Sequence, residues 1–363
     1  MKRRDFLKAG GAGLASTAIA APAIAQSMPE IKWRLTSSFP KSLDTLYGGS
    51  EIFVKAIAEA TDNKFQIQCF AAGEIVPGLQ ALDAASNGTV EMCNTAPYYY
   101  AGKDPTFTFG TAIPFGLNTR MQLAWQRFGG GLELMNELYK KFNVYGMPSG
   151  NTGAQMGGFF RKEINTVDDL RGLKMRIGGV IAGRVMAKLG VVPQQLAGGD
   201  IYPALEKGTV DAAEWVGPYD DEKLGFVKIA KYYYYPGWWE GGAQNANMIN
   251  LDKWNELPPA YRSIIRTASA LQHEWELAKY DAGNPEALKR LVSQGAQLRP
   301  FPPAVMEAAL GAALELYREV SAENPLFKKV WESTLAFRND QYLWWQIAEY
   351  GYDTYLIRTR TRV

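Results

Sequence analysis

DDLRGLKMRIG, residues 168–178, predicts the last turn of a short helix, a glycine stop and then a strand. Thr166 is the expected N-cap, and the two aspartates that follow suit the positive end of a helix. Apolar and basic residues alternate from Leu173 to Ile177, which is the period of a strand. Arg176 should therefore lie on the face opposite the apolar residues, near the strand's end. Ligands bind there in open α/β sheets, and a guanidinium is a planar fork suited to a carboxylate.

The surrounding sequence predicts strands that alternate with helices in two units. The first unit has expected strands at 31–37, 64–70 and 90–94, with helices from Asp44 to about Thr61 and from Pro77 to Asn87. The second has expected strands at 156–161, 173–177 and 210–216, with helices at 180–189 and 201–207. Each βαβαβ order predicts a parallel sheet with helical crossovers.

A short internal similarity supports two related lobes. Leu82 and the run GTVE at 88–91 resemble Leu205 and the run GTVD at 208–211, each combining a glycine helix stop with the start of a strand. Two such lobes with facing strand ends would form a central cleft. We therefore assign lobe I to 26–150, including a helical segment, and lobe II with a crossing strand to 151–257.

The last third, 258–363, is predicted to be helical and to brace the lobes. Asn324-Pro325 opens a run in which aromatic and aliphatic residues recur at helical spacing as far as Tyr355. This run of more than about 30 residues exceeds an ordinary helix of about 11 to 12. It is either a long brace across both lobes or a helix whose end packs on a second copy of the chain.

The N-terminus predicts export. Arg3 and Arg4 precede Asp5-Phe6-Leu7-Lys8, a weakly apolar Ala- and Gly-rich stretch follows, and Ala23-Ile24-Ala25 supplies a small-x-small cleavage site. We interpret 1–25 as a twin-arginine signal peptide that directs the chain to the periplasm. The formal net charge of +2 comes from interspersed charges, with none of the basic stripe expected of a nucleic-acid-binding protein.

Cysteine and histidine are scarce, which excludes several kinds of chemistry. Cys69 and Cys93 fall in expected strands and could pair in the periplasm, but we expect them to be free. His273 is the single histidine, so a histidine-cluster metal site is excluded and a Ser-His-Asp triad would have to use this residue. A hydrogen-bonded or exposed helical histidine is the expected role.

Several oxygen donors are predicted beside the cleft. Glu214 and Trp215 end the strand that precedes Gly217-Pro218, Glu240 lies in the run GWWEGG, and Gln155 follows a turn-rich stretch. Carboxylates, an amide oxygen and the Trp215 carbonyl are ligands that a hard cation prefers. The plain alternative for each glutamate is a salt bridge or a helix cap.

Polar and aromatic residues could complete a ligand site. Tyr98 and Tyr99 follow the third expected strand and could close over a small ligand, each with a ring and a hydroxyl. Asn151 is a further candidate contact, in the turn before Gln155. The glycine-rich segments match neither nucleotide-binding pattern, GxxxxGK[ST] or a properly placed GxGxxG.

The segments 168–178 and 208–218 resemble the solute-binding receptors of tripartite ATP-independent periplasmic (TRAP) transporters, especially their α-keto-acid-binding branch. The resemblance implies an α/β, two-lobed periplasmic binding protein with parallel-type sheets, a central ligand cleft and long C-terminal helices. It also implies that Arg176 pairs with the substrate carboxylate, and that a cation is held by Gln155, Glu214, Trp215 and Glu240. Sodium is the preferred ion and calcium the other candidate.

The function implied is capture of a small 2-oxo monocarboxylate such as pyruvate and its delivery to a membrane permease, without catalysis. The branch includes helix-swapped dimers, which makes a homodimer through the last helix an expectation here. The alternatives are a receptor for a hydroxy acid such as lactate, for another organic acid or for a polyol. An exported enzyme that uses Glu214 and Glu240 as an acid–base pair, or a purely structural periplasmic protein, would be a different class.

Overall fold

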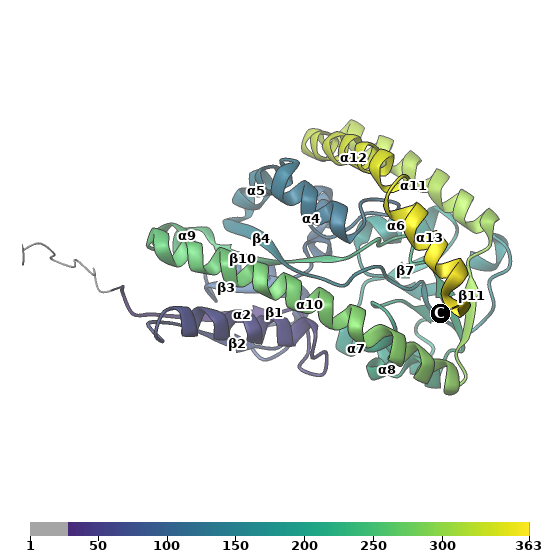
Figure 1. The fold of residues 1–363 in the computed structure, drawn as a ribbon, viewed down its shortest axis with the longest axis horizontal. Coiled ribbons are helices and arrows are strands. Elements are labelled where there is room, and N and C mark those ends of the chain that lie inside the picture. The colour runs from purple at the N-terminus through teal and green to yellow at the C-terminus, as the bar shows by residue number, and fades with distance from the viewer. Residues whose placement is uncertain (1–27, 363) are drawn as a thin grey trace, which may run out of the picture.

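Two mixed β-sheets organise the chain, one in each lobe (Figure 1). The computed structural model describes residues 28–362, so the expected signal peptide at 1–25 lies outside the described residues. The first sheet has the order β2-β1-β3-β10-β4 and the second the order β11-β9-β5-β8-β6-β7. The strands are β1 (Ile31–Ser37), β2 (Phe65–Phe70), β3 (Met92–Thr95), β4 (Val144–Asn151), β5 (Gly158–Phe160), β6 (Lys174–Arg176), β7 (Val192–Gln194), β8 (Ala212–Ala213), β9 (Tyr232–Tyr235), β10 (Gln244–Asn250) and β11 (Gln297–Pro300).

Helices cover both sheets and form the C-terminal third (Figure 1). They are α2 (Leu46–Ala60), α3 (Ala81–Ser86), α4 (Thr119–Phe128), α5 (Gly131–Tyr139), α6 (Val180–Lys188), α7 (Gly198–Glu206), α8 (Pro218–Leu224), α9 (Leu251–Glu256), α10 (Pro259–Ser293), α11 (Pro303–Glu323), α12 (Pro325–Trp345) and α13 (Glu349–Thr359). Within residues 28–362, none of them is both long enough and apolar enough to span a membrane.

The sheets are mixed, which corrects the expectation of parallel-type sheets. In the first sheet β1, β2 and β3 are parallel as predicted, but β10 returns from the second lobe and pairs antiparallel with both β3 and β4. In the second sheet β5 is antiparallel to β8 and β9. Strand β8 lies between β5 and β6, so these two consecutive strands are not neighbours in the sheet.

The segment 168–178 folds largely as predicted. The 3-10 turn is followed by Gly172 at φ +72° and then by β6, of which Arg176 is the last residue. The prediction of Thr166 as N-cap was wrong. Asp169 reaches back instead, and its carboxylate accepts hydrogen bonds from the Thr166 backbone N–H at 2.8 Å and from its hydroxyl at 3.0 Å.

The internal similarity between the lobes extends to its hydrogen bonds. Gly88 and Gly208 both have positive φ, +79° and +73°, at the ends of α3 and α7. The acidic residue three positions later then accepts a hydrogen bond from the backbone N–H of a neighbouring strand. Glu91 accepts from Arg34 at 2.7 Å, and Asp211 accepts from Lys174 at 3.1 Å. In both units, therefore, a glycine ends the helix and an acidic residue three positions later hydrogen-bonds to a strand of the sheet.

The C-terminal helices join the lobes, and the last one stands apart. Helix α10 runs along both lobes and packs against both α2 and α8 (Figure 1).

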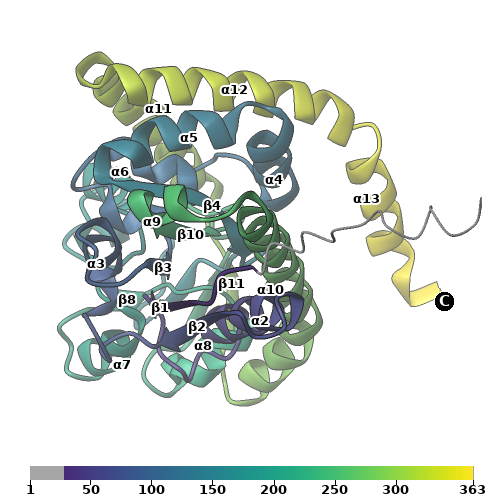
Figure 2. The same ribbon diagram turned by 90° about the vertical axis from the view of Figure 1, so that its left-hand side faces the viewer.

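The single long helix expected after Asn324 is broken at 346–348, ahead of Gly351, into α12 and α13. Arg120 of α4 holds both sides of the break, through an ion pair with Glu349 at 2.7 Å and a contact over the Trp345 ring at 4.7 Å. Figure 2 shows α13 turning away from α12 and projecting beside the body.

The cysteines and the histidine occupy different environments. Cys69 and Cys93 are free, as expected, because β1 lies between their strands β2 and β3. His273 on α10 is buried, so the exposed alternative was wrong. Burial, helped by the charge of Arg127, lowers the pKa of His273 to about 4.

This buried imidazole makes stability fall with acidity. Between pH 6.5 and about 4 the unfolded chain binds the His273 proton more readily than the folded chain, so the free energy of unfolding decreases as pH falls through that window. We expect wild type to lose about 2 to 3 kcal/mol more than His273→Gln between pH 7 and pH 4, measured by urea unfolding. Equal losses in the two proteins would contradict this.

Candidate ligand and cation site

Arg176 forms the buried centre of the site, with 1% of its side chain exposed. Its Nε donates to the Leu196 carbonyl at 3.2 Å, and its Nη1 donates to the backbone carbonyl of Glu214 at 2.7 Å. Nη1 also forms an ion pair with Glu214 Oε1 at 2.6 Å, and the guanidinium lies 4.8 Å from the Trp215 ring. Nη2 has no partner within residues 28–362. Nε and Nη1 are thus held by the protein, and Nη2 remains available to an anion.

Glu214 supplies one satisfied and one free oxygen. Its side chain is fully buried, and Oε1 accepts from Arg176 and from the backbone N–H of Gly178. Oε2 has no partner in the described chain. Burial raises the pKa of Glu214, while the charge of Arg176 and the Gly178 N–H favour its ionised form. For Arg176, burial opposes the charge, but Glu214 together with Tyr99, Tyr98 and Glu240 outweighs it, so the pKa of the guanidinium is raised.

Glu240 is a buried carboxylate that forms no ion pair within residues 28–362. It lies in the loop between β9 and β10, is 1% exposed, and neither oxygen has a hydrogen-bond partner within residues 28–362. Burial and the neighbouring charge of Glu214 hold its pKa well above the usual range, whereas Arg176, Tyr98 and Gln155 act in the opposite direction. A buried carboxylate in this position is stabilised by a proton or by a cation.

Thr152 orients the amide of Gln155 towards this cluster. The Gln155 Nε2 donates to the Thr152 hydroxyl at 3.0 Å, and that hydroxyl in turn accepts from the Ala243 backbone N–H at 3.1 Å. With the amide nitrogen engaged, Oε1 of Gln155 is left as an acceptor that has no donor in the described chain. The oxygens of Gln155, Glu214 and Glu240 together form an acceptor set that suits a hard cation.

The first lobe closes the site with Tyr98 and Tyr99. Both follow β3, in the 3-10 turn Pro97–Tyr100, and the Gln195 amide of the second lobe donates to the Tyr99 carbonyl at 3.2 Å. Gly178 lies between Tyr98 and Glu214, because a Cβ on this glycine would meet the Tyr98 hydroxyl at 2.5 Å and Glu214 Oε1 at 3.2 Å. The tyrosine hydroxyl of one lobe therefore comes close to the carboxylate of the other.

A small cavity of about 10 Å³ lies between the lobes. It is close to the smallest space that holds one water molecule, so the lobes lie tightly together. Four residues predicted for the site line it, together with seven that were not predicted. The predicted ones are Tyr98, Tyr99, Gln155 and Trp215, and the others are Phe39, Leu46, Ala96, Thr152, Val216, Ala243 and Asn245.

The remaining predicted residues lie behind the cavity lining. Arg176 and Glu214 are joined to it through Trp215, and Glu240 through Tyr98 and Gln155. Asn151 is fully buried at the end of β4, where its Oδ1 accepts from Gly153 N at 3.0 Å and from Thr119 Oγ1 at 3.1 Å. Its Nδ2 has no partner within residues 28–362.

Thr152 is the residue that sequence reasoning missed most clearly. A threonine three positions before a predicted glutamine ligand was a local signal that could have been used, because a hydroxyl can fix the orientation of a nearby amide. Phe39 and Leu46 carried no such signal, since they lie in a loop and at a helix start.

Within residues 28–362, no group of three or more His, Cys, Asp or Glu side chains could hold a metal ion. The candidate site has only two carboxylates, and the other donors are an amide oxygen and the Trp215 carbonyl. Two glutamates beside one arginine leave one excess negative charge when all are ionised. A cation among the free oxygens would balance that charge and present a positive centre to an anionic ligand.

Comparison with known proteins identifies the family. Residues 36–324 match the model of "Bacterial extracellular solute-binding protein, family 7". The chain belongs to this family. It is a periplasmic solute-binding receptor of the TRAP transporter type and not an enzyme, which removes the acid–base alternative for the two glutamates.

Three relatives are especially similar to this receptor. The monocarboxylate 2-oxoacid-binding periplasmic protein of Nostoc sp. is 47% identical over 98% of this chain and 99% of the relative. A TRAP solute-binding protein of Bordetella bronchiseptica, a dimer with copurified calcium and picolinate, is 49% identical with a TM-score of 0.90, covering 92% and 99%. One from Pseudoalteromonas atlantica, with bound sodium and pyruvate, is 37% identical with a TM-score of 0.86, covering 89% and 98%.

Replacement of Glu240 by glutamine tests the cation role. Glu240→Gln removes a buried charge that Glu214 repels, so we expect the melting temperature without added cation to equal or exceed that of wild type. Loss of a carboxylate ligand should weaken calcium binding about tenfold or more, measured by titration calorimetry. Glu276→Gln is the matched control, because Glu276 is equally buried on α10 but receives its own hydrogen bond from Asn245 at 2.9 Å. An unchanged calcium affinity in Glu240→Gln would refute the assignment.

Proposed function

We propose that this receptor captures a small 2-oxo monocarboxylate, pyruvate or a close analogue, together with a bound cation, and delivers it to a TRAP membrane permease. The observation that carries the proposal is the set of unpartnered groups at the site: one guanidinium nitrogen of Arg176 beside free oxygens of Gln155, Glu214 and Glu240.

The chemistry of a 2-oxo acid matches these groups. Its carboxylate and adjacent keto oxygen can chelate one metal ion, and the carboxylate can also accept a hydrogen bond from Arg176. The protein oxygens and the Trp215 carbonyl would complete the coordination of that ion. Without the ion, two buried glutamates would repel an anionic ligand.

The walls of the cavity suit a ligand with a short apolar part. Phe39, Leu46 and Val216 line it with apolar surface, and its volume of about 10 Å³ is no more than one water molecule needs, so the lobes must separate to admit an organic acid. The names of the relatives support the same class, because one is a 2-oxoacid-binding protein and another holds sodium and pyruvate. We propose sodium as the preferred ion, with calcium as the competing candidate, and twin-arginine export through residues 1–25.

The test is a thermal-shift screen of small carboxylates, followed by calorimetry with pyruvate. Wild type should be stabilised by pyruvate, less by lactate, and less again after EDTA treatment or exchange of sodium for potassium. A larger shift with lactate or a polyol would favour the alternative ligand classes. A screen without any shift would contradict the proposal.

Arg176 should carry much of the affinity. Arg176→Ala is expected to lose about 2 kcal/mol or more of pyruvate binding, because one partner of a buried charge pair is removed. Arg171→Ala is the matched control on the same segment, since Arg171 is 74% exposed and pairs only with Asp168. Circular dichroism checks that the variants fold. An unchanged pyruvate affinity in folded Arg176→Ala would rule out the proposed contact between Arg176 and the ligand carboxylate.

We also propose that the receptor is a homodimer through α13. Large apolar side chains are exposed from the end of α12 to the end of α13, namely Tyr342, Leu343, Trp344, Ile347, Tyr350, Tyr352, Tyr355, Leu356 and Ile357. A patch of this kind on a soluble protein marks an interaction surface. A groove of about 630 Å³ between α4 and α10 has the same Arg120 on its rim that holds the start of α13, and we propose that it receives α13 of the second copy.

Removal of the helix end should abolish this dimer. Deletion of residues 353–363 is expected to convert a dimer into a monomer in light scattering, and Leu123→Arg in the groove should do the same. Val192→Asp changes an exposed apolar residue on β7 and should leave the dimer intact. A full-length protein that is monomeric would contradict the proposal.

A further inference from the structure

The loop between β1 and α2 forms one wall of the ligand cavity. Phe39 near its start and Leu46 just after its end both line that cavity. Asp44 lies between them and is the only acidic residue of the segment 38–46. This loop belongs to the first lobe, whereas Trp215 and Val216 on the opposite wall belong to the second.

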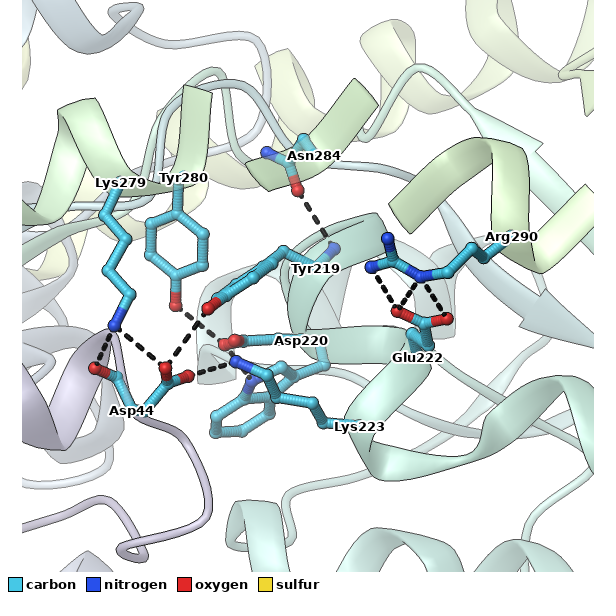
Figure 3. Close-up of polar contacts among 10 residues, drawn as sticks. Asp44, Tyr219, Asp220, Glu222, Lys223, Lys279, Tyr280, Asn284 and Arg290 are labelled. Atoms are coloured by element: carbon cyan, nitrogen blue, oxygen red, sulfur yellow. Dashed lines mark hydrogen bonds and ion pairs between the residues drawn. The ribbon is translucent and has the colours of Figure 1, made fainter. Parts of the chain in front are cut away.

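The carboxylate of Asp44 is held by groups from two other helices (Figure 3). Lys223 of α8 forms an ion pair with Oδ1, and the Tyr219 hydroxyl, also from α8, donates to Oδ2 at 3.1 Å. Lys279 of α10 donates to Oδ2 at 2.8 Å and to the Asp44 backbone carbonyl at 2.8 Å. Three donors from outside the loop therefore converge on one carboxylate.

These contacts are not explained by capping of α2. Thr45 is the N-cap residue, and neither its side chain nor that of Asp44 makes a capping hydrogen bond in the described chain. Burial opposes ionisation of Asp44, but the ammonium groups of Lys223 and Lys279 outweigh it and hold its pKa down at about 2. The charge of Asp44 is directed across the interface between the lobes.

Helices α8 and α10 form a rigid unit on the far side of this contact. Arg290 of α10 pairs with Glu222 of α8 at 2.8 Å, and Asn284 of α10 accepts from the Tyr219 backbone N–H at 3.0 Å (Figure 3). Because the two helices are tied together, the contacts of Asp44 join the first-lobe loop to one structural unit.

The same helix α8 also supports the ligand site. Asp220 lies on α8 next to Tyr219, and its Oδ2 accepts from the Trp215 indole at 3.2 Å and from the Tyr280 hydroxyl at 2.7 Å. Trp215 in turn packs over the guanidinium of Arg176. One short helix thus holds a wall of the site through Asp220 and the opposing lobe through its neighbours.

We propose that Asp44 is a positioning residue for ligand retention. Its contacts with Tyr219, Lys223 and Lys279, which we call the latch, hold the 39–46 loop closed over the cavity and slow the release of the bound acid. The proposal rests on the proposed function, because it concerns the same cavity. Asp44 does not line the cavity, so its effect should fall on dissociation more than on association.

The first test compares dissociation rates of pyruvate by stopped-flow fluorescence. Asp44→Asn keeps the shape of the side chain and removes its charge, and should release pyruvate about threefold to tenfold faster, as expected for a partly exposed ion-pair network. Asp83→Asn is the matched control, because Asp83 is 48% exposed, against 49% for Asp44, and pairs with Lys103 inside one lobe. An unchanged dissociation rate in Asp44→Asn would overturn the proposal.

Salt and a second variant separate the latch from a general loss of structure. The wild-type dissociation rate should rise with ionic strength, because exposed ion pairs are screened, and the rate of Asp44→Asn should depend on salt less steeply. Lys223→Gln should also accelerate release, and the double variant should exceed Asp44→Asn by less than Lys223→Gln alone exceeds wild type. Additive effects, or equal salt dependence, would contradict the proposal.

A distance measurement on the ligand-free protein tests the latch without depending on which ligand the receptor binds. Spin labels placed on α2 and α7, one in each lobe, report lobe separation by pulsed electron paramagnetic resonance. At low salt, Asp44→Asn should show a larger fraction of long distances than wild type, and identical distributions would refute the latch. If wild type fails to respond to pyruvate, the proposed function fails while this distance measurement still decides the role of Asp44.

Discussion

Everything at the site depends on the burial of two carboxylates beside one guanidinium. Glu214 is paired with Arg176, and Glu240 has no ion-pair partner in the described chain. Such a cluster is costly in the absence of a further positive charge. The cluster lies at the junction of the lobes, and under the proposed function a cation bound there would offset the charge of the second carboxylate.

The fold serves this cluster by delivering its parts from distant segments to one place. The end of β6 supplies Arg176, the end of β8 leads into Glu214, and the loop before β10 carries Glu240. The strand β10 then returns to the first sheet, so a segment that carries a site residue also joins the two lobes. Helix α10 packs along both lobes, which makes it the common support against which the 39–46 loop is held.

Local sequence patterns predicted the parts of this structure that depend on neighbouring residues. The alternation around Arg176, the glycine stops and the parallel strands β1, β2 and β3 are all of this kind. The family resemblance predicted the two-lobed fold and the receptor class. The roles of the individual site residues are still proposals, although the structure places Arg176 and Glu214 in direct contact.

The features that sequence reasoning missed depend on long-range partners. Asp44 looked like the start of α2, but its ion-pair partner Lys223 lies 179 positions further along the chain. The break between α12 and α13 is held by Arg120 of a distant helix and falls at 346–348, before the one glycine of this run, Gly351. The antiparallel β5 likewise follows from its pairing with β8 and β9, which no local period encodes.

The most direct test of the account is a crystal structure of the receptor grown with pyruvate and calcium, with anomalous scattering used to locate the ion. The account predicts one calcium at about 2.3 to 2.6 Å from oxygens of Gln155, Glu214, Glu240, the Trp215 carbonyl and the ligand, with the pyruvate carboxylate on Arg176 Nη2. Pyruvate bound in the cleft with no ion among those oxygens, or an ion bound elsewhere, would contradict it.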